Sequence, residues 1–369
     1  MNLFDLARPG LFCLDAEKAH GLAIRALKSG LLPAPPVRSD PRLNVRLAGL
    51  DFPNPVGVAA GFDKNGEVPD ALLRLGFGFT EIGTVTPRPQ PGNPRPRIFR
   101  IVERNAVINR LGFNNDGHDS AFLRLQQRSR KDGIVGVNVG ANKDSEDFSA
   151  DYVAGIAKFA GLADYFTVNI SSPNTPGLRN LQAAEALSRL LQLVLAERDR
   201  QAVLAGRRRP VFLKVAPDLD AGQIGEIATI ARESHGAGGL DGIIISNTTL
   251  ARTGVEGMNN AAQAGGLSGR PLFERSTIIL ARMRMAMGSA IPVIGVGGVD
   301  SEKTAIAKLE AGANLLQLYT GMIYQGPMIA ARINRGIVLE MDARNLSGVS
   351  ELTGMKTGDW AERKLPEEA

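Results

Sequence analysis

The segment IPVIGVGGVDSEKTAIAKLEAGANLLQLYTG (291–321) decides the fold of this chain. It holds an apolar β-rich run, PVIGVG (292–297), a helical pattern over about 302–311, and a second apolar run, LLQLYT (315–320). A strand, a helix and a strand in this order predict two parallel strands joined by a right-handed crossover.

The same alternation repeats from about residue 55 onward. Helical patterns separate the apolar runs, including a long amphipathic segment from about Leu181 to Ala205 and another after Pro271. Eight such units specify a TIM (β/α)8 barrel, a fold of the α/β class. The predicted strands are PVGVAA (55–60), FTEIGTV (79–85), IVGVNVG (134–140), YFTVNI (165–170), VFLKVA (211–216), GIIISN (242–247), PVIGVG (292–297) and LLQLYT (315–320).

Polar side chains occupy the predicted strand ends, where the active site of such a barrel lies. One or two of them could cap the helices that follow. A lysine inside an apolar run and three asparagines at matching ends favour a site instead. The polar residues are Thr84, Asn138, Asn169, Lys214, Ser246, Asn247, Tyr319 and Thr320.

The motif GVGGVD (295–300) follows the seventh strand and precedes a helix. Backbone N–H groups and the helix dipole at such a turn can hold a phosphate monoester. A glycine motif alone is weak evidence. Its place after the seventh strand, with LYTG (318–321) after the eighth, matches a frequent phosphate site of barrels.

Two segments lie outside the repeating pattern. A Pro- and Arg-rich insertion (87–115) follows the second strand, and RIFRI and AVINR within it predict an antiparallel pair. A loop of this length over a barrel is usually a lid or a binding wall.

In the first ~35 residues, Asp15 predicts the N-cap of a helix ending near Gly30, and Pro9-Gly10 is expected to interrupt the apolar residues before it. We expect a helical hairpin whose apolar face packs on the barrel or meets a bilayer surface.

The composition narrows the class of protein. With 44% hydrophobic and 22% charged residues, the 369-residue chain can bury a large core. The net charge of +5 suits small anions, anionic lipid or nucleic acid, but the basic residues are scattered, which disfavours nucleic acid. The lone Cys13 excludes an internal disulfide and a cysteine-ligated iron–sulfur cluster within the chain. Without a signal peptide or a ~20-residue apolar run, we expect a cytosolic setting and no membrane-spanning segment.

Nine motifs, in order along nearly the whole chain, resemble the dihydroorotate dehydrogenase family. Each lies at a predicted loop or strand end, so the set is far more specific than any one motif. The motifs are AAGFDKNGE (59–67), INRLGFNN (108–115), GVNVGANK (136–143), NISSPNTPG (169–177), KVAPD (214–218), SNTT (246–249), GGLSGRPL (265–272), GVGGV (295–299) and LYTG (318–321).

The resemblance implies oxidation of dihydroorotate to orotate in pyrimidine (UMP) biosynthesis, with FMN as the hydride acceptor and no metal. A base on one face of the ring takes a proton next to a carbonyl, while hydride leaves the adjacent carbon toward the flavin. In this family the base is Cys in one class and Ser in the other, at the position of Ser172 here. The family suggests a proton relay through Thr175, Phe113 and water. From the residues alone, SSPN is equally a good turn former.

The resemblance also implies the binding residues. Asparagine offers the donor and acceptor that amide-like substrate edges need, and a cation such as Lys214 stabilises charge that develops on the reduced flavin. The implied substrate-binding residues are Lys64, Asn109, the backbone of Arg110, Leu111, Gly112 and Phe113, then Asn169, Asn174, Asn247 and Thr248. The implied FMN-binding residues are Ala60, Gly61, Phe62, Asp63, Lys64, Thr84, Asn138, Asn169, Lys214, Ser246, Gly269, Gly298, Tyr319 and Thr320.

Ser172 and the N-terminal hairpin together imply the class that reduces a membrane quinone without a separate iron–sulfur subunit. The hairpin would form the quinone channel, with His20 and Arg100 at positions that line it; otherwise they are a helix-face His and a surface Arg. The implied organisation is an amphipathic extension (1–38) and an FMN-binding barrel (39–369) that carries the inserted hairpin. The implied location is the cytoplasmic face of the inner cell membrane, as a peripheral protein.

Other classes fit the residues less well. The chain has no GxSxG motif, and none of His20, His118 and His235 lies in a motif near a carboxylate, which disfavours a hydrolase triad. Another FMN barrel oxidoreductase, acting on a different pyrimidine or on tRNA uridine, stays open because the flavin half of the motifs is shared more widely. A membrane-surface scaffold would need a broken site, and no matched motif position is substituted.

Overall fold

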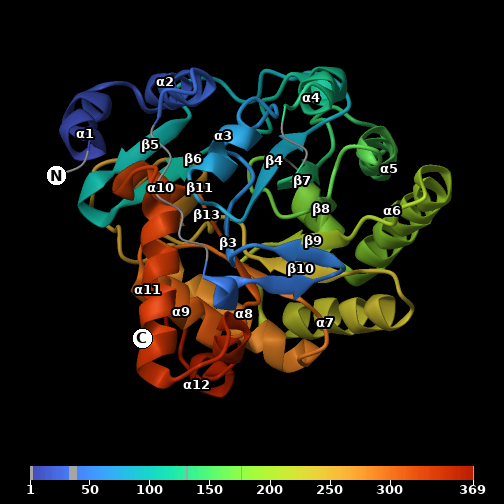
Figure 1. Ribbon diagram of the computed structural model, residues 1–369. Helices are drawn as coiled ribbons and strands as arrows, with labels where there is room; N and C mark the ends of the chain where they lie inside the picture. The colour runs from blue at the N-terminus through green and yellow to red at the C-terminus, as the bar shows by residue number, and fades with distance from the viewer. Residues whose placement is uncertain (1–2, 33–39, 130–131, 176, 369) are drawn as a thin grey trace.

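Eight parallel strands close into a barrel at the centre of the molecule (Figure 1). The computed structural model describes residues 3–32, 40–129, 132–175 and 177–368. Each barrel strand falls on one of the predicted runs, so the predicted TIM barrel is confirmed. In order around the barrel the strands are β3 (Val56–Val58), β4 (Phe79–Val85), β7 (Ile134–Val139), β8 (Tyr165–Asn169), β9 (Val211–Val215), β10 (Gly242–Ile245), β12 (Val293–Val296) and β13 (Leu315–Leu318).

The strand register brings polar residues of neighbouring strands side by side. Asn169 of β8 lies opposite Lys214 of β9, and Gly83 of β4 lies opposite Asn138 of β7. Almost all strand residues are buried because helices cover the barrel from outside, which explains why the strands read as short continuous apolar runs.

Helices follow the strands and surround the barrel (Figure 1). Capping boxes begin two of them: Asp220 with Gln223 starts α7, and Ser301 with Thr304 starts α9. The larger helices are α4 (Gly117–Gln126), α5 (Phe148–Phe159), α6 (Ala184–Ala205), α7 (Ala221–Gly236), α8 (Leu272–Met287), α9 (Glu302–Glu310) and α11 (Ile329–Arg344). Shorter ones are α3 (Pro69–Arg74), α10 (Thr320–Gln325), α12 (Thr357–Ala361), η1 (Pro41–Leu43), η2 (Val102–Arg104), η3 (Leu178–Gln182) and η4 (Val349–Leu352).

A three-stranded antiparallel sheet lies outside the barrel. The insertion supplies β5 (Ile98–Ile101) and β6 (Ala106–Asn109), which confirms the predicted pair. The third strand, β11 (Gly266–Gly269), comes from the loop after β10 and pairs with β6, and the sequence did not predict it. A further unpredicted hairpin, β1 (Val45–Leu47) with β2 (Leu50–Phe52), precedes the barrel.

The N-terminal residues form the predicted helical hairpin, α1 (Leu3–Cys13) and α2 (Ala16–Lys28). The Asp15 carboxylate accepts bonds from two backbone N–H groups and caps α2 as predicted. The predicted interruption at Pro9-Gly10 is wrong, because α1 continues through Pro9. Proline lacks the backbone N–H for one intrahelical hydrogen bond. Phe4, Leu11 and Phe12, on either side of it, line one cavity, and their packing offsets the loss of that hydrogen bond.

Two arginines of the insertion fasten this hairpin to the barrel. The buried Arg97 donates to both Glu17 oxygens of α2, at 2.7 and 3.1 Å. Arg100 donates to the carbonyls of Phe12 and Leu14 at the end of α1, at 3.3 and 2.9 Å. The predicted domain boundary at residue 38 and most of the predicted breaker LLPAPP lie outside the described residues.

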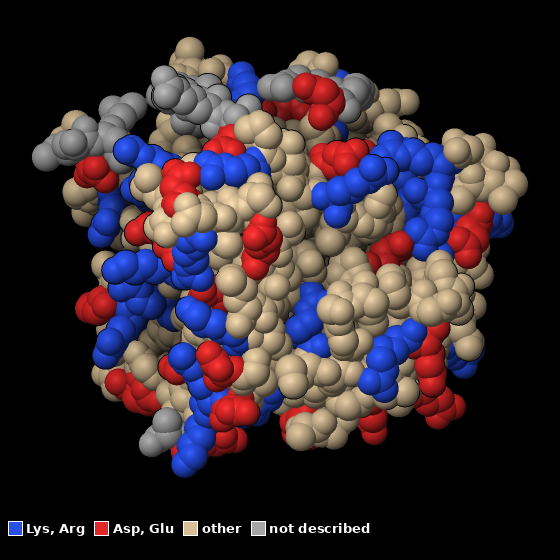
Figure 2. Space-filling model, turned by 60° about the horizontal axis from the view of Figure 1, so that its bottom comes forward, with Lys and Arg blue, Asp and Glu red and all other residues tan. Residues whose placement is uncertain are grey.

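None of the helices in the described part of the chain is long and apolar enough to cross a bilayer. On the face seen in Figure 2, Lys and Arg lie in small groups with Asp and Glu among and beside them. Charges of both signs therefore alternate on this face, and it does not present the continuous basic stripe that favours nucleic acid.

Candidate active site

A cavity of about 570 Å³ opens at the carboxyl ends of the barrel strands and continues between the barrel and the helices α1 and α2. Its volume lies in the usual range for small-molecule and cofactor sites. The cavity brings together most of the residues implied by the resemblance. They are His20, Ala60, Gly61, Phe62, Lys64, Thr84, Arg100, Asn109, Leu111, Gly112, Phe113, Asn169, Ser172, Asn174, Lys214, Ser246, Asn247, Thr248, Gly269, Gly298, Tyr319 and Thr320.

Three implied residues do not line the cavity, and two of them instead hold residues that do. The Asp63 carboxylate accepts bonds from the backbone N–H groups of Glu67 and Val68, which fixes the loop that carries Lys64. Asn138 accepts a bond from the Thr84 hydroxyl at 2.6 Å. The Arg110 side chain stacks over Phe99 and donates to the carbonyl oxygens of Pro96 and Ala264, just before the strands β5 and β11, as its implied backbone role allows.

One end of the cavity is a glycine-rich turn between β12 and α9. Gly297 and Gly298 have positive φ values of 105° and 74°, which glycine adopts without strain. A Cβ atom on Gly298 would lie 2.4 Å from the Phe273 backbone, because the turn packs on the start of α8. Ser301 caps the nine-residue helix α9 that follows. This turn, with Gly269, Tyr319 and Thr320 beside it, suits a phosphate group at the positive end of a helix.

Lys214 brings a cation to the wall of the cavity. The residue is 5% exposed, and its ammonium has no hydrogen bond or ion pair with another described residue. Burial lowers the pKa of Lys214, while Glu81 opposes this shift. A buried cation that faces a cavity without a protein partner fits a ligand with an anionic or strongly polar acceptor.

Glu81, which the sequence prediction missed, lies inside the barrel and binds Asn138, the residue that holds Thr84. Its carboxylate accepts bonds from Asn138, Tyr165, Thr167 and Gln317, at 2.7–3.0 Å. Burial and the adjacent carboxylate raise the pKa of Tyr165, which keeps that hydroxyl protonated as a donor. Glu81 therefore fixes Asn138.

Asn138 in turn orients Thr84 at the wall of the cavity. The Asn169 side-chain amide donates to the Thr84 hydroxyl at 2.9 Å, so the polar chain continues toward the loop after β8. Four side chains, from Glu81 to Asn169, thus form one buried network, and each determines the orientation of the next.

Ser172 lies on the loop after β8 among side-chain amides. Its oxygen accepts a bond from the Asn174 backbone N–H at 3.2 Å, and the residue is 5% exposed. The Asn174 amide reaches the Asn109 carbonyl at 3.3 Å, and the Asn247 amide donates to the Ser171 hydroxyl at 2.9 Å. An N–H bond to the serine oxygen favours its deprotonated form, as a base requires.

Lys64 also lines the cavity. Burial lowers its pKa to about 8, against the opposing charge of Glu17. Below pH 8 the side chain is charged and can hold a carboxylate group.

Thr175 is buried and Phe113 lines the cavity with a positive φ of 52°, and the proton relay through them stays a prediction.

The part of the cavity next to α1 and α2 is lined mainly by apolar side chains. The His20 ring of α2 contacts Phe62 and Tyr319 edge-on or tilted, with centroids 5.2 and 6.2 Å apart. Burial and the charge of Lys64 lower the pKa of His20 to about 3, so the imidazole is neutral near pH 7. Arg100 stacks over Phe12 at 4.8 Å. The walls suit an uncharged, lipophilic molecule.

The glycine turn, Lys214 and the segment Ala60-Gly61 could together hold a flavin mononucleotide. The glycine turn suits its phosphate, the lysine suits the ring edge that gains negative charge on reduction, and Ala60 and Gly61 allow close approach of a flat ring. Within the described residues, no group of three or more His, Cys, Asp or Glu side chains is placed to hold a metal ion.

Comparisons with known proteins point to one family. Residues 42–341 match the family model described as dihydroorotate dehydrogenase. The chain is 60% identical to a dihydroorotate dehydrogenase (quinone) of Brucella anthropi and 59% identical to that of Brucella ovis, with 99% of each chain covered. It superposes on the crystal structure of DHODH from Eimeria tenella in complex with ferulenol with a TM-score of 0.87. The identity is 36%, over 92% of this chain and 95% of that chain.

We expect Gly298→Ala to lower the amount of FMN that copurifies with the protein. The added methyl group meets the Phe273 backbone, and the turn keeps a positive φ that a residue with a Cβ rarely adopts. We expect an overpacking cost of about 1–3 kcal/mol at the turn that receives the phosphate. Absorbance at 450 nm relative to 280 nm measures the flavin content. Gly161→Ala is the control, because its methyl group has open space and an ordinary φ. Full flavin content in Gly298→Ala would contradict the assignment of the phosphate end.

Proposed function

The chain belongs to the dihydroorotate dehydrogenase family, and we propose that it oxidises dihydroorotate to orotate with bound FMN as hydride acceptor and a quinone as final electron acceptor. One observation carries this proposal. A single cavity joins a serine with amide side chains in the same lining, a buried lysine without a hydrogen-bond partner among the described residues, a glycine turn, and an apolar mouth under two helices. The serine suits a proton acceptor, the lysine and the glycine turn suit a flavin, and the apolar mouth suits a lipophilic oxidant.

Ser172 is the proposed base that removes the proton next to the substrate carbonyl. A free serine hydroxyl is a weak base, so its surroundings must stabilise the oxygen after it loses its own proton. The Asn174 backbone N–H supplies part of this stabilisation through its 3.2 Å contact. The proton released by Ser172 leaves by the predicted relay.

The amide cluster and Lys64 are the proposed substrate cradle. Asn109, Asn174 and Asn247 present donors and acceptors toward the amide-like edges of a pyrimidine ring. The Lys64 ammonium is the proposed partner of the substrate carboxylate. This arrangement fixes the ring so that its reacting carbons lie between the serine and the flavin.

FMN is the proposed cofactor, held by the glycine turn, Thr84, Asn169 and Lys214. When bound, it would accept the hydride from the substrate and pass the two electrons on to the oxidant. Lys214 stabilises the charge that develops at the cofactor without a large movement of the chain, because the strand fixes its position. The Glu81 network keeps Thr84 and Asn169 oriented.

The apolar mouth is the proposed quinone channel. Its walls come from α1, α2 and the aromatic residues next to the flavin end, with neutral His20 at their junction. Two relatives carry the word quinone in their names, which supports this choice of oxidant. We infer that no separate iron–sulfur subunit takes part.

The exposed faces of α1 and α2 are the proposed contact with the membrane. Leu6 on α1 is 66% exposed and Leu22 on α2 is 39% exposed, and Leu14 in the turn between the two helices is also 39% exposed. Apolar side chains on an amphipathic helix can insert at the interface of a bilayer. We therefore propose a peripheral protein on the cytoplasmic face of the cell membrane, with the helical extension as one unit and the barrel as the other.

The proposed function predicts a yellow protein whose flavin bleaches when dihydroorotate is added without oxygen and recovers when a quinone follows. Bleaching follows from hydride transfer, and recovery follows from electron transfer to the oxidant. Absorbance at 450 nm reports both half-reactions. A flavin that dihydroorotate leaves oxidised would refute the proposal, and a perturbed spectrum with orotate distinguishes this enzyme from other FMN barrels.

Ser172→Ala should lower the rate of flavin reduction by about 10²- to 10⁴-fold, the usual contribution of a general base. Binding of FMN and orotate should persist, because the hydroxyl is a small part of either contact surface. Anaerobic stopped-flow absorbance measures the rate, and spectral titration measures orotate binding. Reduction at the normal rate would remove Ser172 as the base.

Ala23→Trp should slow flavin reoxidation by a quinone while leaving reduction by dihydroorotate unchanged. Ala23 lines the apolar mouth, and an indole there fills the path between α2 and the barrel. Leu22→Trp is the matched control, since Leu22 lies on the outer face of the same helix. If both variants reoxidise as fast as the unaltered protein, the channel does not run between α2 and the barrel.

A further inference from the structure

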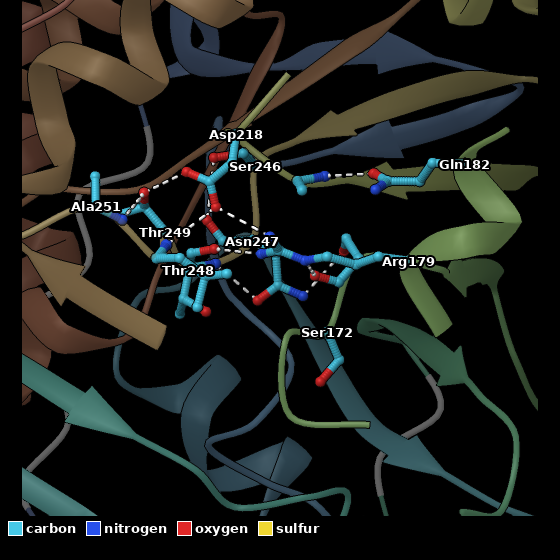
Figure 3. A network of polar contacts seen from close by, with 12 residues as sticks. Ser172, Arg179, Gln182, Asp218, Ser246, Asn247, Thr248, Thr249 and Ala251 are labelled. Carbon is cyan, nitrogen blue, oxygen red and sulfur yellow. Dashed lines mark hydrogen bonds and ion pairs between the residues drawn. The ribbon is translucent and has the colours of Figure 1, made fainter. Parts of the chain in front are cut away.

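Arg179 connects the loop that carries Ser172 with the loop that carries Asn247 and Thr248. The residue lies on η3, and its guanidinium donates to the Ser171 carbonyl at 3.3 Å and to the Thr248 carbonyl at 3.3 Å. In Figure 3 the guanidinium lies between the two loops, and the Ser172 side chain points away from it. One planar group therefore binds the peptide just before the proposed base and the peptide of a proposed substrate-binding residue.

Asp218, in the loop after β9, holds this guanidinium in place. Its carboxylate accepts from Arg179 at 3.1 Å and from the Leu250 backbone N–H at 3.0 Å. It also accepts from the Thr249 hydroxyl and, at 3.3 Å, from Arg275 of α8. The carboxylate thus receives donors from three different segments.

Gln182 adds a second connection from η3 to the same strand end. Its side-chain oxygen accepts the Ala216 backbone N–H at 3.0 Å (Figure 3). The short helix after the Ser172 loop is therefore fixed at both ends to the part of the barrel that carries Lys214.

We propose that Arg179 is a positioning residue for the dehydrogenase reaction, setting the separation between Ser172 and the substrate-binding residues Asn247 and Thr248. This inference rests on the proposed function. It adds a residue that binds neither substrate nor cofactor and acts through two backbone carbonyls.

The physical basis is the rigid fork of the guanidinium. Arginine presents several N–H donors in one plane, whereas lysine offers one nitrogen that cannot reach all three acceptors in this geometry. The pair with Asp218 is partly exposed, with side-chain exposures of 23% and 18%, so its effect on stability is expected to be modest. A displacement of about 1 Å between a base and its substrate can cost on the order of 10²-fold in rate.

The test compares Arg179→Met, Arg179→Lys and Arg275→Met in the FMN-loaded full-length protein. Arg275→Met is the matched control, because it also removes a cation from Asp218 but does not touch the Ser171 or Thr248 carbonyl. Anaerobic stopped-flow gives the rate of flavin reduction at saturating dihydroorotate across pH. Hydrogen exchange gives the protection of the Asn174 and Thr248 amides.

We expect Arg179→Met to slow flavin reduction by about 30- to 100-fold, with reoxidation by quinone unchanged. The rising limb of its pH profile should move to higher pH, because the Asn174 N–H no longer stabilises the Ser172 oxygen as well. Both amides should exchange faster. Arg179→Lys should be intermediate, and Arg275→Met should stay within about 3-fold of the unaltered protein.

Two results would overturn the inference. One is normal reduction and normal amide protection in Arg179→Met. The other is an equal loss of rate and of melting temperature in Arg179→Met and Arg275→Met. That result would mean that the network stabilises the fold in general and does not position Ser172. If dihydroorotate fails to bleach the unaltered protein, the proposed function fails, while the exchange experiment still decides whether Arg179 couples the loops.

Discussion

Closure of the barrel is the constraint on which the site depends. Eight parallel strands that pair in a ring must present their carboxyl ends at the same rim, whatever the distances between them along the chain. Asn169 and Lys214 are 45 positions apart in sequence yet lie opposite each other in register. The ring also makes the rim rigid, so a small set of side chains can hold a flat cofactor and a flat substrate in fixed relation.

The sequence predicted the barrel well because buried parallel strands are encoded locally. Runs such as GIIISN and VFLKVA are short, apolar and flanked by helical patterns, so both their type and their order could be deduced. The strand β11 could not, because GLSG has no apolar pattern and becomes a strand only by pairing with β6. The continuous helix through Pro9 was missed for a similar reason: its stability comes from packing of residues on both sides of the proline.

The site shows the same division between local and distant information. Residues at strand ends and in glycine turns could be predicted, because their positions in the fold follow from the motif alone. Glu81 and Arg179 could not be assigned a role, since their partners come from remote segments. In the sequence, Glu81 is a charged residue inside the apolar strand FTEIGTV, with no visible partner. In the fold, four donors surround its carboxylate and explain its burial. Asp63 and Asn138 similarly support their neighbours instead of lining the cavity.

The way in which α1 and α2 are attached has a consequence for how such a protein can change over time. The hairpin is held by Arg97 and Arg100 of the insertion and by ring contacts such as that of His20 with Phe62, and it contributes no residue to the amide cluster around Ser172. Substitutions along these two helices can therefore alter which oxidant is accepted while the proton-accepting end keeps its geometry. The two halves of the catalytic cycle are thus open to separate selection within one polypeptide.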